Sequence, residues 1–81
     1  YTFSALKEWV QTRIGVLRNR QIVAGALRDR LQNGNFRIIP FVYDEGRDVL
    51  IDQDNIEAQQ LDQELDIEFA DRDEVILEIA Q

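Results

Sequence analysis

Residues 36–43, FRIIPFVY, are the most strand-like stretch of this 81-residue chain, because branched and aromatic side chains dominate them. Alternate residues of a strand point to opposite faces, and both faces are apolar here. Phe36, Ile38 and Val42 share one face, and Ile39, Phe41 and Tyr43 share the other. Pro40 cannot donate a hydrogen bond to a neighbouring strand, so we expect an edge strand or a bulge at that point.

The segments after this stretch predict further strands. A DEGR turn follows, and residues 48–52 form a returning strand that completes a hairpin. Residues 65–70 alternate between apolar and acidic side chains, and residues 75–80 place Val75, Leu77 and Ile79 at every second position. Both patterns predict half-buried strands, joined by a DRDE turn. Residues 53–63 are mostly polar and predict a short helix or a loop.

The segment before residue 36 is apolar at helical spacing. Ser4 is a candidate N-cap for a helix over residues 4–15. A second apolar stripe, shifted by roughly a third of a turn, predicts another helix over residues 20–32. Asn19 could cap this helix, and Asn33-Gly34-Asn35 would end it. One long helix with a twisted stripe is the alternative.

These elements predict an α+β domain, with two N-terminal helices packed on one face of a small, mostly antiparallel sheet of about four strands. The opposite face would be acidic and exposed to water, since carboxylates occupy every second position of residues 65–70. Residues 1–81 suffice for a single small domain with one core. The chain begins at Tyr1 rather than at Met, so we expect it to be part of a larger protein.

The composition excludes several kinds of site. The chain has no cysteine and no histidine, which removes disulfides, thiolate metal sites and the commonest general base. Absence of cysteine fits a cytoplasmic or otherwise intracellular protein, and no apolar run is long enough to span a bilayer. Asp52, Asp54 and Glu57 resemble the start of a calcium loop, but the glycine and glutamate required at its sixth and twelfth positions are missing.

Nor does the sequence suggest catalysis. Ser4 is the only serine and has no histidine to activate it, and the four glycines are too scattered to form a phosphate-binding loop. Sixteen acidic residues make chance pairs of carboxylates unavoidable, so such pairs carry no information. We therefore expect a protein that is not an enzyme and that holds no cofactor and no metal.

The charge is divided between the two halves of the chain. Residues 1–38 carry seven basic and two acidic side chains, whereas residues 39–81 carry two basic and fourteen acidic ones. Arg18, Arg20 and Arg28 suggest one alternative, a winged-helix-like nucleic-acid-binding domain in which helix 20–32 enters a groove. These arginines share no exposed face, however, and the acids would repel phosphate. Pairing with the acids at the rim of the sheet explains the arginines better.

The preferred interpretation is a non-catalytic protein–protein interaction or assembly module. Helices can cover only one face of strand 36–43, so its second face or its edge is the candidate interface. The candidate contacts are Ile39, Phe41, Tyr43 and the neighbouring Arg37. The expected partner is a protein, including a second copy that forms a homo-oligomer. Nucleic acid is the less favoured partner, and no membrane partner is expected. Trp9 lies on the first apolar stripe and is assigned to the core.

Overall fold

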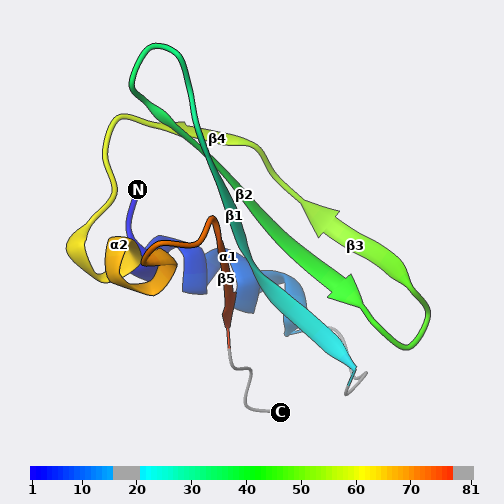
Figure 1. Ribbon diagram of the computed structural model, residues 1–81. Coiled ribbons are helices and arrows are strands. Elements are labelled where there is room, and N and C mark those ends of the chain that lie inside the picture. The colour runs from blue at the N-terminus through cyan, green and yellow to red at the C-terminus, as the bar shows by residue number, and fades with distance from the viewer. Residues whose placement is uncertain (16–20, 78–81) are drawn as a thin grey trace.

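A computed structural model describes residues 1–15 and 21–77 of the chain (Figure 1). Its elements are α1 (Phe3–Ile14), β1 (Ile22–Arg30), β2 (Phe36–Asp44), β3 (Val49–Gln53), β4 (Ile56–Ala58), α2 (Gln63–Phe69) and β5 (Glu74–Leu77). All the strand pairings in the described residues are antiparallel. The predicted α+β class is confirmed. The arrangement differs in two respects, because one helix lies near the C-terminal end and the sheet has five strands.

The predicted strand 36–43 is the centre of the sheet. The strand order is β3-β2-β1-β5, and β4 pairs with β2 next to β3. β1 and β2 form a long hairpin with nine paired positions, from Ile22 opposite Asp44 to Arg30 opposite Phe36. The residues first interpreted as a helix stop form the turn of this hairpin, where Gly34 has a φ of 87°. A central β2 means that residues 36–43 are not an edge strand, and that prediction is wrong.

Pro40 is tolerated in the central strand because its missing donor faces an interrupted ladder. The Asp54 amide donates to the Pro40 carbonyl at 3.1 Å, and the reciprocal bond cannot form. The neighbouring strand is divided at this position, with β3 ending at Gln53 and β4 beginning at Ile56. The register shift in this ladder lies not at Pro40 but between Val42 and Tyr43. A broken partner strand therefore replaces the predicted edge or bulge.

The prediction of a helix over residues 20–32 is wrong, because residues 22–30 form β1. The apolar residues Ile22, Val23, Ala26 and Leu27 fit a helical stripe, but they also fit a strand with two apolar faces. Pairing along the full length of β2 decides between the two. Asn19, the predicted cap, lies outside the described residues.

The strand predicted over residues 65–70 is wrong as well, because these residues lie in α2. Asp62 caps this helix, its Oδ1 accepting from the Leu65 amide at 2.9 Å. Leu65 and Phe69 are four residues apart, so both face the core from one side of the helix, while Ile67 points outward. In the sequence, Leu65, Ile67 and Phe69 are also two residues apart, so the same pattern fits one face of a strand. Part of the segment 53–63, predicted as a helix or loop, forms the short strand β4.

The other predicted elements agree with the structure in type. The helix predicted over residues 4–15 is α1, although Thr2 rather than Ser4 is its N-cap and accepts from the Ala5 amide at 3.0 Å. The returning strand 48–52 corresponds to β3. Within residues 75–80, the described part forms β5, and residues 78–80 lie outside the described chain.

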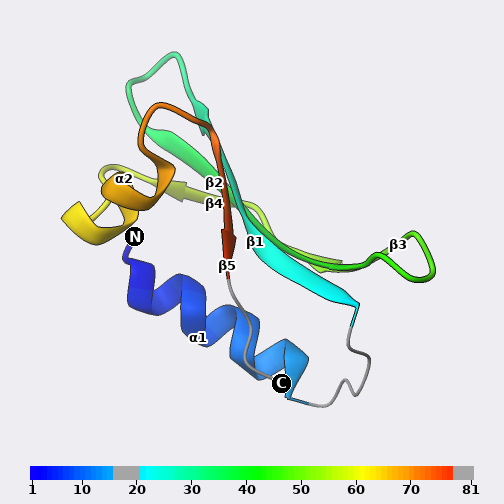
Figure 2. The same ribbon diagram turned by 60° about the horizontal axis from the view of Figure 1, so that its bottom comes forward.

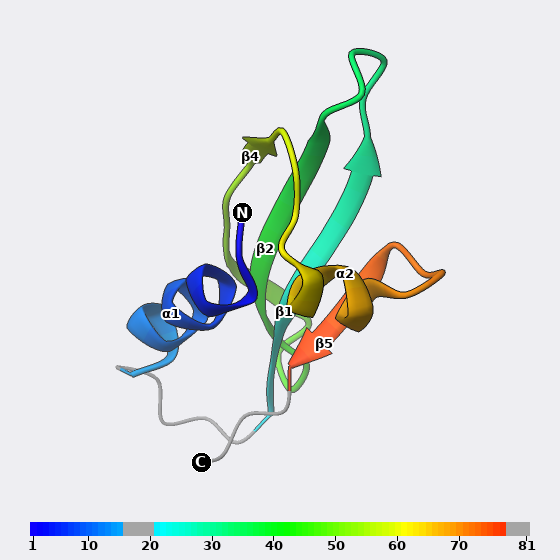
Figure 3. The ribbon, with the colours of Figure 1, turned by 90° about the vertical axis from the view of Figure 1, so that its left-hand side faces the viewer.

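α1 and α2 lie on the same face of the sheet, and the core lies beneath them (Figures 2 and 3). The side chains from the helices that are buried there are Leu6, Val10, Leu65 and Phe69. Those from the sheet are Ile22, Ala24, Ala26, Ile38, Val42 and Val75. Trp9 is half-buried against this cluster, as its place on the apolar stripe predicts.

Gly25 allows β5 to approach β1 closely. Gly25 is opposite Ile76 in the β1–β5 ladder. A Cβ atom at residue 25 would overlap the carbonyl oxygen of Val75 and lie 2.9 Å from its carbonyl carbon. These obstacles are backbone atoms, which cannot rotate away as a side chain can. The position therefore requires glycine.

We predict that Gly25→Ala lowers the free energy of unfolding by about 2 kcal/mol or more, because β5 must move away from β1. Gly15→Ala is the matched control, since residue 15 has ordinary helical φ and ψ and its Cβ would lie 3.2 Å from the Gln11 carbonyl oxygen. The control is expected to change stability by less than about 1 kcal/mol. Urea unfolding of both variants measures the difference, and equal effects would contradict the assignment.

Candidate protein-binding face

Ile39, Phe41 and Tyr43, the predicted interface residues of β2, lie on the face of the sheet opposite the helices. Alternate residues of β2 from Ile38 to Asp44 are buried toward α1 and α2, whereas these three are only half-buried. Figure 2 shows both helices on one side of the sheet and no element over the other side. The structure thus brings the three residues together on a face that no described residue covers.

The strands on either side extend this apolar surface. The register places Leu27 opposite Ile39 and Val23 opposite Tyr43. Leu50 of β3 is also opposite Tyr43, and Ile76 of β5 is opposite Gly25. We call the resulting surface the open face: Val23, Leu27, Ile39, Phe41, Tyr43, Leu50 and Ile76. Leu27, Leu50 and Ile76 are 39%, 47% and 49% exposed, which is high for large apolar side chains.

Sequence reasoning found only the β2 part of the open face. The sequence places Leu27 in a predicted helix, and the alternating pattern of residues 75–80 does not show which strand lies beside Ile76. The four strands share one surface because strands pair along both edges of β2, and the sequence patterns do not show which strands pair. The only available signal was that β2 itself is apolar on both faces.

The expected acidic outer face of the sheet is not observed. Asp66 and Glu68, on which the expectation depended, lie on α2 because residues 65–69 form a helix. Asp71 and Asp73 lie in the turn between α2 and β5. Much of the negative charge is therefore carried by α2 and the turns, and the centre of the open face is uncharged.

Arg37, the fourth predicted interface residue, lies at one end of the open face in a row of charges. It is opposite Asp29 of β1 and opposite Glu57 of β4. Hydrogen bonds from Asn35 and Asn33 lower the pKa of the Glu57 carboxyl, and the Arg37 charge lowers it further. Arg37 therefore borders the apolar surface with an acidic residue on each side.

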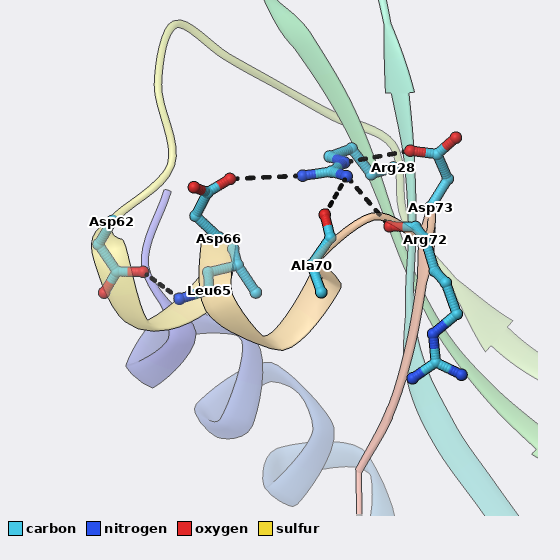
Figure 4. A network of polar contacts seen from close by, with 7 residues as sticks. All are labelled: Arg28, Asp62, Leu65, Asp66, Ala70, Arg72 and Asp73. Atoms are coloured by element: carbon cyan, nitrogen blue, oxygen red, sulfur yellow. Dashed lines mark hydrogen bonds and ion pairs between the residues drawn. The ribbon is translucent and has the colours of Figure 1, made fainter.

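Arg28 is half-buried at the junction of β1, α2 and the turn before β5. Its guanidinium donates to the carbonyl oxygens of Ala70 and Arg72 at 3.3 and 3.0 Å (Figure 4). It also pairs with the carboxylates of Asp66 at 3.5 Å and Asp73 at 3.3 Å. The guanidinium carbon lies 4.7 Å from the centre of the Phe69 ring, and only 12% of the side chain is exposed. We call this arrangement the Arg28 clamp, because it ties the turn between α2 and β5 to β1.

The clamp confirms that Arg28 pairs with acids of the second half of the chain. Arg18 and Arg20, the other two arginines proposed to contact nucleic acid, lie outside the described residues. The expected groove-reading helix is also absent, since residues 22–30 form a strand. Arg13 of α1 pairs with Asp52 of β3 at 2.7 Å and stacks on Trp9.

The described residues contain no cluster of carboxylates placed to hold a metal ion, and none of their helices is long and apolar enough to cross a membrane. Two of the acids first compared with a calcium loop have other contacts. Asp52 pairs with Arg13, and Glu57 accepts from Asn35 at 2.7 Å.

Ala70 is strained at the end of α2. Its φ of 52° and ψ of −125° lie in a region that glycine adopts far more readily than alanine. Its amide donates to the Asp66 carbonyl at 2.9 Å and its own carbonyl accepts from Arg28, so the clamp holds the residue in this conformation. Its side chain is exposed, and truncating it removes no buried contact.

We predict that Ala70→Gly raises the free energy of unfolding by about 1 kcal/mol, because relief of backbone strain outweighs the greater entropy of glycine in the unfolded chain. Thermal unfolding measured by circular dichroism tests this. A lower melting temperature for the variant would show that Ala70 is not strained.

We predict that Arg28→Ala lowers the free energy of unfolding by about 2–3 kcal/mol, through the loss of two carbonyl partners and of packing on Phe69. Asp66→Asn and Asp73→Asn are the controls. Their side chains are 67% and 77% exposed, so each ion pair should contribute less than about 1 kcal/mol. Urea titrations distinguish the two effects. Carboxylate variants as unstable as Arg28→Ala would mean that charge, rather than packing and carbonyl bonding, holds the clamp.

Comparison with known proteins does not assign the chain to a family. No protein-family model matches it, and no significant match is found among curated proteins or solved structures. The open face and the Arg28 clamp are therefore interpreted from their geometry alone.

Proposed function

We propose that this domain is a non-catalytic assembly module that associates with a second copy of itself through the open face. One observation supports this most directly: both helices cover the same side of the sheet, and the other side presents apolar side chains from four strands. Contiguous apolar surface of this kind is typical of protein interfaces. Of the two predicted contacts, the second face of strand 36–43 or its edge, the proposal keeps the face, because β2 is paired along both edges.

The distribution of charge favours a second copy as the partner. Two sheets pack face to face about 10 Å apart, and a twofold axis brings the same patch of each copy together. At net charge −7, two copies repel each other unless their acids are kept apart. α2 and its acids lie on the far side of the sheet, so face-to-face packing separates those acids, and the acidic residues on the open-face side lie at its rim: Asp29, Glu57 and Glu74.

The size of the open face indicates a weak association. The open face spans five residues of each central strand, Val23 to Leu27 in β1 and Ile39 to Tyr43 in β2, so it measures about 17 Å along the strands and about 15 Å across them. That is on the order of 250 Å² for each copy, compared with about 800 Å² in a standard stable interface. We therefore expect a dimer that forms in a concentration-dependent manner.

The nucleic-acid alternative has less support. A winged-helix domain needs a recognition helix, and β1 occupies that part of the chain. Arg28 is enclosed by the clamp, and no described arginine lies at the centre of the open face. Salt also separates the two functions. Added salt screens repulsion between acidic copies and should strengthen self-association, whereas it weakens phosphate binding.

We predict that Phe41→Asp or Tyr43→Asp weakens self-association by about tenfold or more, because a charge would be buried without a partner. Sedimentation velocity and light scattering over a concentration series measure the association. Ile67→Asp is the matched control: it replaces a large apolar residue that is 65% exposed, but on α2. A wild-type protein that stays monomeric at millimolar concentration, or equal effects of all three variants, would contradict the proposal.

A further inference from the structure

β5 is an edge strand with backbone groups directed away from the sheet. The Arg28 amide donates to the Asp73 carbonyl at 2.9 Å, and the register continues with Leu27 opposite Glu74 and Ala26 opposite Val75. In an antiparallel ladder, every second residue bonds to the neighbouring strand. Val75 therefore faces β1, and the N–H and C=O groups of Glu74 and Ile76 point outward. Figure 3 shows no neighbouring strand on that side, and no described residue pairs with those groups.

The opposite edge of the sheet is protected in ways that β5 is not. Pro40 interrupts the ladder between β2 and the outer strands, and the register shifts next to Val42. The outward amides of Gln53 and Asn55 are bonded by the carboxylates of the preceding residues, each at 2.8 Å. Such features hinder the addition of another strand. Glu74–Leu77 contains no proline and no register shift, and Glu74 is its only charged residue.

The β5 edge is also held in place before any partner binds. The Arg28 clamp ties the turn before β5 to β1, and Gly25 lets the β5 backbone approach β1 closely. A strand already ordered in the unbound protein loses less conformational entropy on binding than a loop that must first become ordered.

The surroundings of β5 define the chemistry of the partner. Glu74 and Ile76 project from the open face, and Ile76 is 49% exposed. Asp71, Asp73 and Glu74 are exposed and outnumber Arg72 in this segment. Asp73 is paired with Arg28, so this end of the edge is net negative mainly through Asp71 and Glu74. A partner strand would therefore gain from an apolar residue opposite Ile76 and a basic residue opposite Glu74.

From these observations we infer that β5 binds one extended strand of a basic protein partner, added antiparallel to its outer edge. Read from its N-terminus, the partner presents two apolar residues opposite Ile76 and Val75, then lysine or arginine opposite Glu74 and Asp73. Backbone hydrogen bonds supply the binding, and the basic residues supply the selectivity. This interaction goes beyond self-association and uses the outer backbone edge of β5, although the side chain of Ile76 belongs to both surfaces.

The probe is the blocked peptide acetyl-TIVKKT-amide, with acetyl-TIVEET-amide as its charge-reversed control. NMR titration of the ¹⁵N-labelled domain follows each amide. The basic peptide is expected to shift the Glu74 and Ile76 amides and to protect both from hydrogen exchange. It should bind at least about tenfold more tightly than the acidic peptide, since one or two opposite charges at the edge replace like ones.

Ile76→Pro tests the edge itself. Proline removes the outward N–H but leaves the bonds of Val75 and Leu77 to β1, so the variant should fold. Ile76→Ala is the matched control, because it loses the same apolar side chain but keeps the N–H. We expect Ile76→Pro to bind the basic peptide at least about fivefold more weakly than Ile76→Ala. If the proline variant does not fold, hydrogen exchange of the wild-type Glu74 and Ile76 amides decides the question.

Peptide binding at the β5 edge and self-association through the open face can be tested separately. Phe41→Asp should weaken self-association and leave peptide binding unchanged, so either function can fail alone. The inference is overturned if the basic peptide does not protect the Glu74 and Ile76 amides, or if both peptides bind equally. It is also overturned if Ile76→Pro disrupts self-association more than Ile76→Ala does, because the β5 edge would then be occupied by a second copy.

Discussion

The central strand β2 is paired along both edges and apolar on both faces, and the rest of the structure depends on this combination. Pairing with β1 on one side and with β3 and β4 on the other leaves its buried amides little need for other partners. The two helices cover one of its faces and form the core there. None of the residues that the structure describes lies over the second face, so apolar side chains are left exposed there.

The C-terminal part of the fold depends on one half-buried arginine. Arg28 lies on the helix side of β1, where its guanidinium packs on Phe69 and bonds to carbonyls at the end of α2. One of those carbonyls belongs to the strained Ala70 and the other to Arg72 in the turn that follows. Backbone strain is maintained where the surrounding contacts determine the conformation. The clamp therefore positions β5, and with it the Ile76 contribution to the open face.

Prediction from sequence succeeded where the spacing of the apolar residues fits one type of secondary structure, and it failed where the spacing fits both a helix and a strand. Leu6, Trp9, Val10 and Ile14 together fit only a helix, and the branched and aromatic residues of β2 favour a strand. Residues 22–27 suit either structure, and residues 65–69 have apolar side chains at positions that suit both a strand and a helical turn. In each case a partner outside the segment decided: β2 for β1, and the Asp62 cap together with the core for α2.

The sequence by itself determined the α+β class, the first helix, the strand over residues 36–43 and its two apolar faces, because local spacing specifies each of them. Only the tertiary structure decided that this strand is central, that β1 is a strand and α2 a helix, and that four strands share one open face. It also decided that Arg28 is an internal clamp. The physical reason is that strand pairing and burial are long-range: they choose between local conformations of nearly equal propensity and determine which side chains stay exposed.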